Sequence, residues 1–223
     1  MSFKLDKYDN YISIGYNCFT AMLLNNLKLR EKAYPVDWVI SSPEYILKYF
    51  KTNFENYYLP NKTATVNYLG QEFYWERHHK MAEANDFHCE NNISDDSLSI
   101  YQDNRTKYER RITRINNLLD TKESILFIYS TEYTINSCKD ANFEKELKEN
   151  EDKYHNDLIE LKKFLSNKYP NKKIDILTIY FNSKNKYPIS GKINDIFVHN
   201  VNLTVSNDSL NRKRVTELLR PIF

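Results

Sequence analysis

The residue best placed for covalent chemistry is Cys18. A short apolar stretch from Tyr11 to Ile14 predicts a strand that runs into Gly15, where the lack of a Cβ allows a tight turn. Apolar residues at helical spacing follow, so the thiol is predicted to lie in the first turn of an amphipathic helix (Phe19, Met22, Leu23 and Leu27). The positive end of a helix dipole favours the reactive thiolate. This arrangement suits a nucleophile, although a free cysteine near a strand end is more often a small buried hydrophobe.

A thiol nucleophile needs a base, and the chain has five histidines. His78 and His79 follow an aromatic run at a predicted strand end, which would point at least one of them toward the rim of a cleft. His199 is the rival, because it alternates with apolar residues on one strand face, where a lone histidine is more often a satisfied core residue. We expect His155 at the surface of a long helix and His88 in a polar segment.

Asp37 is a candidate for the acid that orients the base. It stands between Val36 and Trp38, where an ionised carboxylate would need a hydrogen-bonding partner such as an imidazole. The alternative is that Asp37 caps a turn between two helices. The sequence leaves both roles open.

Three stretches between Gly15 and Trp38 together resemble the signature of a family of papain-like cysteine peptidases known from bacteria and large DNA viruses. They are Gly15-Tyr16-Asn17-Cys18, Leu29-Arg30 and Tyr34-Pro35-Val36-Asp37-Trp38. A weaker similarity is a stretch from Trp75 to His79 followed by a helix rich in Tyr and Arg from Tyr108 to Arg114. Val36 departs from the family pattern, which has Phe there. The resemblance implies that Cys18 is the nucleophile and that His79, ahead of His78, is the base.

Further residues are candidates for binding the substrate. We expect a pocket lined by Trp38, Trp75 and part of the segment from Lys80 to Asn104, with the N–H of Asn17 or of Cys18 stabilising an oxyanion. Arg111 belongs to a cluster with two further arginines, and such a cluster can clamp a carboxylate or phosphate, although it is usually a solvated helix face (Arg110, Arg111 and Arg114).

The remaining pattern predicts the elements that position these residues. Ser42 is expected to cap a helix from Pro43 to about Thr52, and two short strands or a hairpin are expected between Thr63 and Trp75. The polar segment from Lys80 to Asn104 is predicted to be a long loop, and a helix is predicted from Arg105 to Leu119.

The second half of the chain has the pattern of a β-α-β unit. Apolar runs from Ser124 to Tyr129 and from Ile174 to Phe181 flank an amphipathic helix (Tyr154, Leu158, Leu161 and Leu165). A further strand is expected from Ile196 to Val205, followed by a C-terminal helix capped by Asp208. The pattern favours a single α/β domain over residues 1–223, with three layers and a mainly parallel sheet flanked by helices. A papain-like α+β arrangement is the alternative that the resemblance implies.

Composition limits the partners. Lys and Arg total 32 against 30 for Asp and Glu, so charge gives no drive toward nucleic acid or an anionic membrane. No apolar run approaches the length of a membrane span, and three widely spaced cysteines do not make a disulfide framework. We therefore expect a cytoplasmic protein, or one inside a host cell if it is viral or an effector.

No cofactor or metal is expected. Glycines at positions 15, 70 and 191 alone cannot form a dinucleotide-binding fingerprint or a P-loop, and no closely spaced Cys or His pair suggests zinc. The function that the sequence favours is a papain-like cysteine peptidase, or a related acyl hydrolase or transferase, acting on a protein, peptide or acylated substrate. The alternative is a non-catalytic interaction or effector protein that retains an enzyme-like fold.

Overall fold

The structure, a computed structural model, describes residues 5–15, 18–37, 42–55, 63–68, 71–76, 97–131, 150–181, 190–201 and 212–223. For residues 18, 63–68, 71–76, 97–104, 190 and 212–214 it describes the backbone only. Statements about the fold and its contacts refer to these residues.

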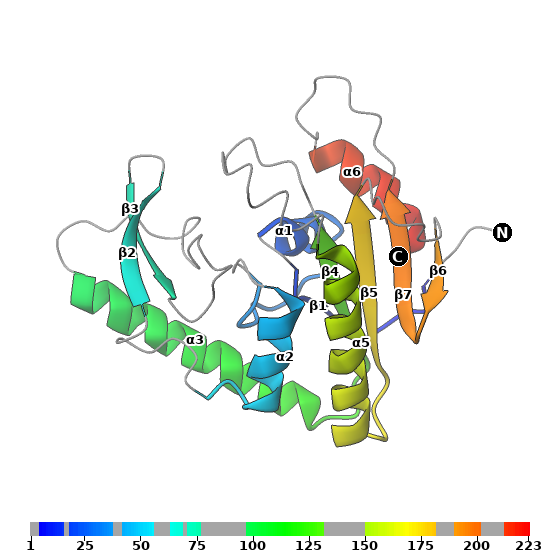
Figure 1. Cartoon of the computed structure of the whole chain (residues 1–223), viewed down its shortest axis with the longest axis horizontal. Helices are drawn as coiled ribbons and strands as arrows, with labels where there is room; N and C mark the ends of the chain where they lie inside the picture. Colours follow the sequence, from blue (N-terminus) through cyan, green and yellow to red (C-terminus); the bar gives the residue numbers. More distant parts are fainter. Residues whose placement is uncertain are drawn as a thin grey trace.

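A five-stranded sheet forms the centre of the molecule (Figure 1). Its strands, in spatial order, are β1 (Asn10–Ser13), β4 (Ile125–Thr131), β5 (Ile174–Phe181), β7 (Ile196–Val201) and β6 (Ser190–Ile193). The first four run parallel, and β6 pairs antiparallel with β7 at the edge. Every residue of β4 is buried, as expected for a parallel strand covered on both faces. The predicted mainly parallel sheet is confirmed.

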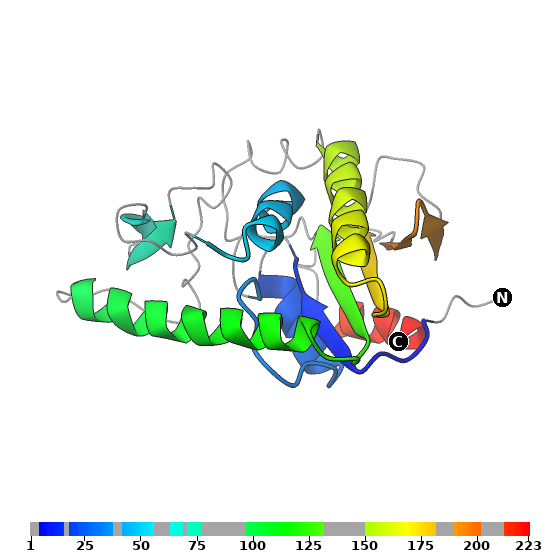
Figure 2. The same cartoon turned by 90° about the horizontal axis from the view of Figure 1, so that it is seen from below.

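Helices cover both faces of this sheet and complete the three layers (Figures 1 and 2). One face packs against α2 (Pro43–Lys51), α3 (Ser97–Leu119) and α5 (Glu151–Lys168) through a large apolar core. The other face packs against α1 (Cys18–Asn26) and α6 (Arg212–Leu219), which is followed by the short helix η2 (Arg220–Ile222). The apolar faces that the sequence pattern predicts for these helices therefore pack against the two faces of the sheet.

Two local predictions differ from the structure. α3 begins at Ser97, so residues 97–104 are helical although the sequence pattern assigned them to a polar loop. Few apolar residues occur there, but straight-chain and polar residues are compatible with a helix that is already formed further along. Strand β6 was not predicted. It enters β7 through a two-residue turn in which Asn194 and Asp195 both have positive φ, which is typical of a tight hairpin.

The hairpin and the helix cap that the sequence predicts are present, whereas part of the last predicted strand lies outside the described residues. The hairpin is present as β2 (Thr63–Tyr68) paired antiparallel with β3 (Gln71–Glu76). Ser42 occupies the N-cap of α2, and its carbonyl accepts hydrogen bonds from the N–H groups of Tyr45 and Ile46. Residues 202–205 of the predicted last strand, and the predicted cap Asp208, lie outside the described residues.

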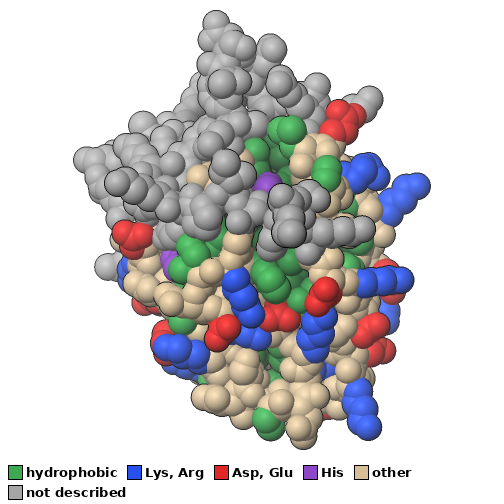
Figure 3. Space-filling model, turned by 90° about the vertical axis from the view of Figure 1, so that its right-hand side faces the viewer, with side chains coloured by type: hydrophobic (Ala, Val, Ile, Leu, Met, Phe, Trp, Pro, Cys, Tyr) green, Lys and Arg blue, Asp and Glu red, His purple; other side chains and the backbone are tan. Residues whose placement is uncertain are grey.

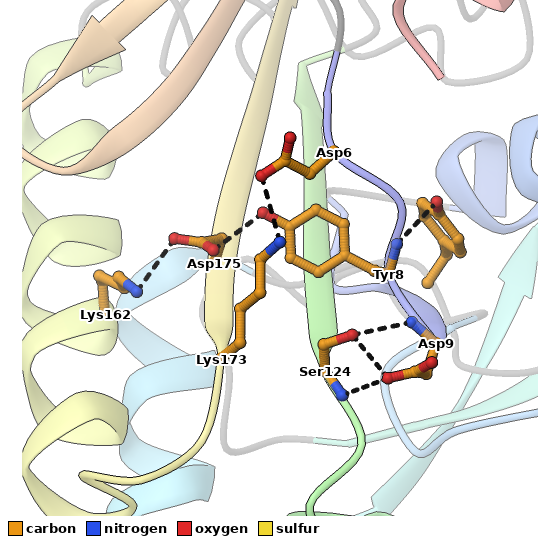
Figure 4. A network of polar contacts seen from close by, with 8 residues as sticks. Asp6, Tyr8, Asp9, Ser124, Lys162, Lys173 and Asp175 are labelled. Atoms are coloured by element: carbon orange, nitrogen blue, oxygen red, sulfur yellow. Dashed lines mark hydrogen bonds and ion pairs between the residues drawn. The ribbon is translucent and has the colours of Figure 1, made fainter.

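A polar network fastens the amino ends of the strands (Figure 4). The Tyr8 hydroxyl donates to Asp175 Oδ2 over 2.8 Å, and Lys162 Nζ donates to Asp175 Oδ1 over 3.1 Å. Asp9 and Ser124 exchange hydrogen bonds, with 2.8 Å between Ser124 N and Asp9 Oδ2. These contacts join the segment before β1 to the starts of β4 and β5. The network lies at the amino ends of the strands, whereas Cys18 follows the carboxyl end of β1. We therefore interpret these contacts as structural.

The face seen in Figure 3 carries basic and acidic side chains interspersed, in keeping with the balanced charge of the chain. At the β6 edge, Lys192 pairs with Asp195 over 3.3 Å, and such exposed charges discourage further strand pairing. Within the described residues, no helix has both the length and the apolar character needed to cross a membrane.

Candidate active site

The turn after β1 is held close to the sheet. The N–H of Ile14 continues the parallel ladder by donating to the Ile128 carbonyl over 2.9 Å, and the N–H of Gly15 donates to Ser13 Oγ over 3.4 Å. A Cβ atom at Gly15 would stand 1.9 Å from Thr20 Oγ1 and 2.6 Å from Thr20 Cβ. Glycine is therefore required here by close approach of the turn to the first turn of α1.

Thr20 also ties α1 to the neighbouring strand. Its Oγ1 lies 2.5 Å from Ser130 Oγ of β4, and both side chains are buried. A buried hydroxyl pair of this kind stabilises only while both partners are present, because either one alone would be left desolvated. Neither Thr20 nor Ser130 was predicted as a site residue, since a Thr and a Ser more than a hundred residues apart form no recognisable motif.

Cys18 is the first residue of α1, as predicted. The helix begins just beyond the carboxyl end of β1, and Phe19 packs edge-on against Phe181 at the end of β5, with ring centroids 5.7 Å apart. Cys18 thus follows the carboxyl end of a parallel strand, and the carboxyl ends of such strands are where α/β proteins bind their ligands. The N-terminal end of a helix at this position favours a negative charge on the residue that it carries.

Asp37 lies in a buried turn between α1 and α2. Its Oδ2 accepts hydrogen bonds from Arg30 Nη2 at 2.8 Å, from Arg30 Nε at 3.1 Å and from the Tyr34 N–H at 2.8 Å. Asp37 thereby caps the turn, which is one of the two roles left open by the sequence. Arg30, the partner that holds it, was not predicted.

The second oxygen of Asp37 differs from the first. Among the residues that the structure describes, buried Oδ1 has no hydrogen-bond partner. Burial raises the pKa of the Asp37 carboxyl, while Arg30, the Tyr34 N–H and Arg111 act to lower it. An oxygen with an open lone pair in a desolvated site can still accept a hydrogen bond from an imidazole N–H.

The arginine cluster of α3 does not behave as a single exposed group. Arg111 is only 6% exposed, lies 4.9 Å from the centroid of the Tyr108 ring and contributes to the field at Asp37. Arg114 Nη1 donates to the Ala33 carbonyl, while Arg110 is exposed. The interpretation of these three residues as one solvated helix face is wrong for Arg111, which is part of the core next to the Asp37 turn.

Two histidines are described, and they lie on opposite faces of the sheet. His199 alternates in β7 with Phe197 and Val201, which pack in the same apolar core as α1. His155 of α5 lies over the other face, where its Nδ1 is 3.0 Å from the Tyr180 hydroxyl. His155 is 5% exposed, so the expectation that it lies at the surface is wrong. Burial lowers the pKa of both imidazoles.

The other candidates are placed only in part. Trp75 lies in β3, opposite Ala64 of β2. Residues Asn17 and Trp38 lie outside the described residues, as do three of the histidines (His78, His79 and His88). The geometry of the proposed base relative to the thiol therefore stays a prediction.

One comparison with known proteins identifies a family. Residues 9–158, more than half of the chain, match the family model described as "Putative papain-like cysteine peptidase". The matched region includes Cys18, the Asp37 turn and all the histidines except His199. No curated protein and no solved structure gives a significant match.

Proposed function

The chain belongs to this family of papain-like cysteine peptidases, and from that premise we propose that it is a hydrolase with Cys18 as its nucleophile. The observation that carries the proposal is the position of Cys18 as the first residue of α1, five residues after the end of β1 in a parallel sheet. The close approach of Thr20 to Gly15 and its hydroxyl pair with Ser130 support the proposal, because they hold the start of α1 against the carboxyl ends of β1 and β4.

The proposed reaction is an acyl transfer in two steps. The Cys18 thiolate attacks the carbonyl carbon of a peptide, ester or other acyl substrate, and the N–H of Cys18 or Asn17 stabilises the oxyanion. His79 takes the thiol proton and returns it to the leaving group, which departs as the thioester forms. Water, deprotonated by the same histidine, then releases the acid, whereas another acceptor in place of water would make the protein a transferase.

The pH dependence of alkylation by iodoacetamide tests the nucleophile. Peptide mass spectrometry follows all three cysteines at once, so Cys89 and Cys138 serve as internal references. We expect Cys18 to react fastest, with a midpoint below the ordinary thiol value of about 8.5. A midpoint at that value, with no rate advantage over the other two cysteines, would contradict the assignment and favour a non-catalytic interaction protein.

Neighbouring histidines provide a matched test of the base. We expect His79→Ala to raise the alkylation midpoint of Cys18, because an imidazolium near the thiolate stabilises it, and His78→Ala to leave the midpoint unchanged. The variant His199→Ala tests the alternative base, His199, which lies on the α1 side of the sheet. If His199→Ala shifts the midpoint and His79→Ala does not, the base is His199 and the nucleophile assignment stands.

The role of Asp37 can be separated from its contribution to folding. We propose that its Oδ1 orients the imidazole while Oδ2 holds Arg30 and the Tyr34 N–H. Asp37→Asn replaces one carboxylate oxygen with an amide nitrogen and removes the charge, whereas Arg30→Lys loses one of the two N–H bonds to Oδ2 and leaves the carboxylate in place. Both variants should lower stability, but only Asp37→Asn should change the pH profile of Cys18 alkylation. Equal changes in the two variants would reduce Asp37 to a turn cap.

A further inference from the structure

Two arginines of α3 that the proposed mechanism does not use, Arg110 and Arg114, line a cavity. It has a volume of about 390 Å³ and lies between the C-terminal half of α3 and the segment after α1. Arg110 and Arg114 come from α3, Lys32 and Tyr34 from the segment after α1, and Glu123 from the turn before β4. This volume lies within the range of small-molecule sites, about 300–1,000 Å³.

The helix presents a continuous polar face to this cavity. Arg110, Thr113, Arg114 and Asn117 all line it, and their spacing of i, i+3, i+4 and i+7 places them on one side of α3. Arg114 is oriented by the bond from its Nη1 to the Ala33 carbonyl, which leaves its other N–H groups for a ligand. The site therefore combines a fixed guanidinium with hydroxyl and amide groups.

The charge of the lining is strongly biased. Three cations face one carboxylate, so the cavity carries two net positive charges in a chain whose total is +2. Within the part of the chain that the structure describes, neither Lys32 nor Arg110 takes part in an ion pair or hydrogen bond, although both line the cavity. Glu123 accepts a hydrogen bond from Asn10 Nδ2 over 2.8 Å, which holds it at the rim.

The nearby end of α3 does not cancel this bias. A helix C-terminus presents carbonyl groups that repel anions. Lys172 Nζ donates to the Leu118 carbonyl at 2.7 Å and to the Thr121 carbonyl at 2.8 Å, so a cation already satisfies two carbonyls at this end. The electrostatic character of the cavity is set by its basic side chains.

We propose that this cavity binds a small, doubly charged oxyanion, either a phosphate ester or a dicarboxylate. Such an anion matches the two net positive charges, and the planar guanidinium groups suit both phosphate and carboxylate oxygens. The exposed Asn117 amide, and the Thr113 hydroxyl as an acceptor because its hydrogen is donated to the Glu109 carbonyl, would contact the uncharged part of the ligand.

Titration calorimetry with the full chain tests the site, using glucose 6-phosphate, inorganic phosphate and malate, with glucose as the uncharged probe. We expect saturable binding of at least one anion and none of glucose. Lys32→Ala and Arg110→Ala should each weaken binding by about tenfold, the usual effect of losing a charge-assisted contact. Glu123→Gln should tighten it, since the repulsive carboxylate is removed while the amide oxygen can still accept from Asn10.

Lys48→Ala is the matched control, because Lys48 is an exposed cation of α2 that does not line the cavity. It should leave the affinity unchanged. Binding of the phosphate compounds alone identifies a phosphate ester, and binding of malate alone identifies a dicarboxylate. The proposal is overturned if no anion binds saturably, or if Lys48→Ala weakens binding as much as Arg110→Ala.

Discussion

At the scale of single residues, the turn before Cys18 depends on the contact between Gly15 and Thr20. We expect Gly15→Ala to destabilise the protein by about 1–3 kcal/mol, because the added Cβ would stand 1.9 Å from Thr20 Oγ1 in a buried site. Thr20→Ala should also destabilise, since it leaves Ser130 without this partner. Urea denaturation of the double variant should give less than the sum of the two effects, because the clash with Oγ1 is gone and only the approach to Thr20 Cβ at 2.6 Å remains.

Thr20→Ser provides the control for this cycle. Serine keeps Oγ, so Gly15→Ala should cost as much in that background as in the natural one. Strict additivity of Gly15→Ala and Thr20→Ala would contradict the contact.

Single residues also mark the limit of what the sequence predicts. The type and spacing of residues placed Cys18 at a helix start, because apolar periodicity is a local signal. The roles of Arg30 and Thr20 and the burial of His155 were not predicted, because each depends on a partner brought close by the fold. Polar partners at long sequence separation leave no periodic trace.

At the scale of elements, the hairpin of β6 and β7 depends on its two-residue turn. Asp195 has φ of 67°, and a left-handed conformation costs a residue with a Cβ about 1–2 kcal/mol, with Asn and Asp tolerating it best. We expect Asp195→Val to destabilise by about that amount and Asp195→Gly to be neutral or stabilising, as measured by thermal unfolding. Asp195→Asn separates charge from conformation, because it loses the exposed pair with Lys192 and keeps the backbone preference. A large loss in Asp195→Asn would contradict the conformational explanation.

Some elements were predicted correctly and others were missed, and the difference has a physical reason. The predicted strand from Ile174 to Phe181 coincides with β5, because a continuous apolar run is required wherever a strand is covered on both faces. β6 was missed because an edge strand of four residues, Ser190–Ile193, buries little and needs no such run. The early start of α3 was missed because its first residues carry few apolar side chains.

At the scale of the whole molecule, a sheet covered on both faces buries ionisable groups on each side of it. His155 is buried on the α5 side and His199 is half-buried on the α1 side, and burial lowers the pKa of both, opposed at His155 by Asp152. In the unfolded chain both would titrate near about 6.5. As the pH falls below that value, the unfolded state takes up protons that the folded state does not, so the folded state loses relative stability.

This coupling predicts a loss of stability in mild acid. The contribution of the two histidines is fully present above about pH 6.5 and is lost as the pH falls through their lowered folded values. The urea midpoint should therefore decrease between pH 7.5 and 5.5, and it should decrease less in a His155→Asn/His199→Asn variant. Asparagine can still offer a hydrogen bond to the Tyr180 hydroxyl.

The other shifted carboxyls do not produce this effect. The carboxyls of Asp9 and Glu160, whose pKa values are lowered, titrate below this pH range. The raised pKa of Asp37 acts with the opposite sign, because protonation of Asp37 favours the folded state. An unchanged dependence on pH in the double variant would show that the two imidazoles do not control the acid sensitivity of this fold.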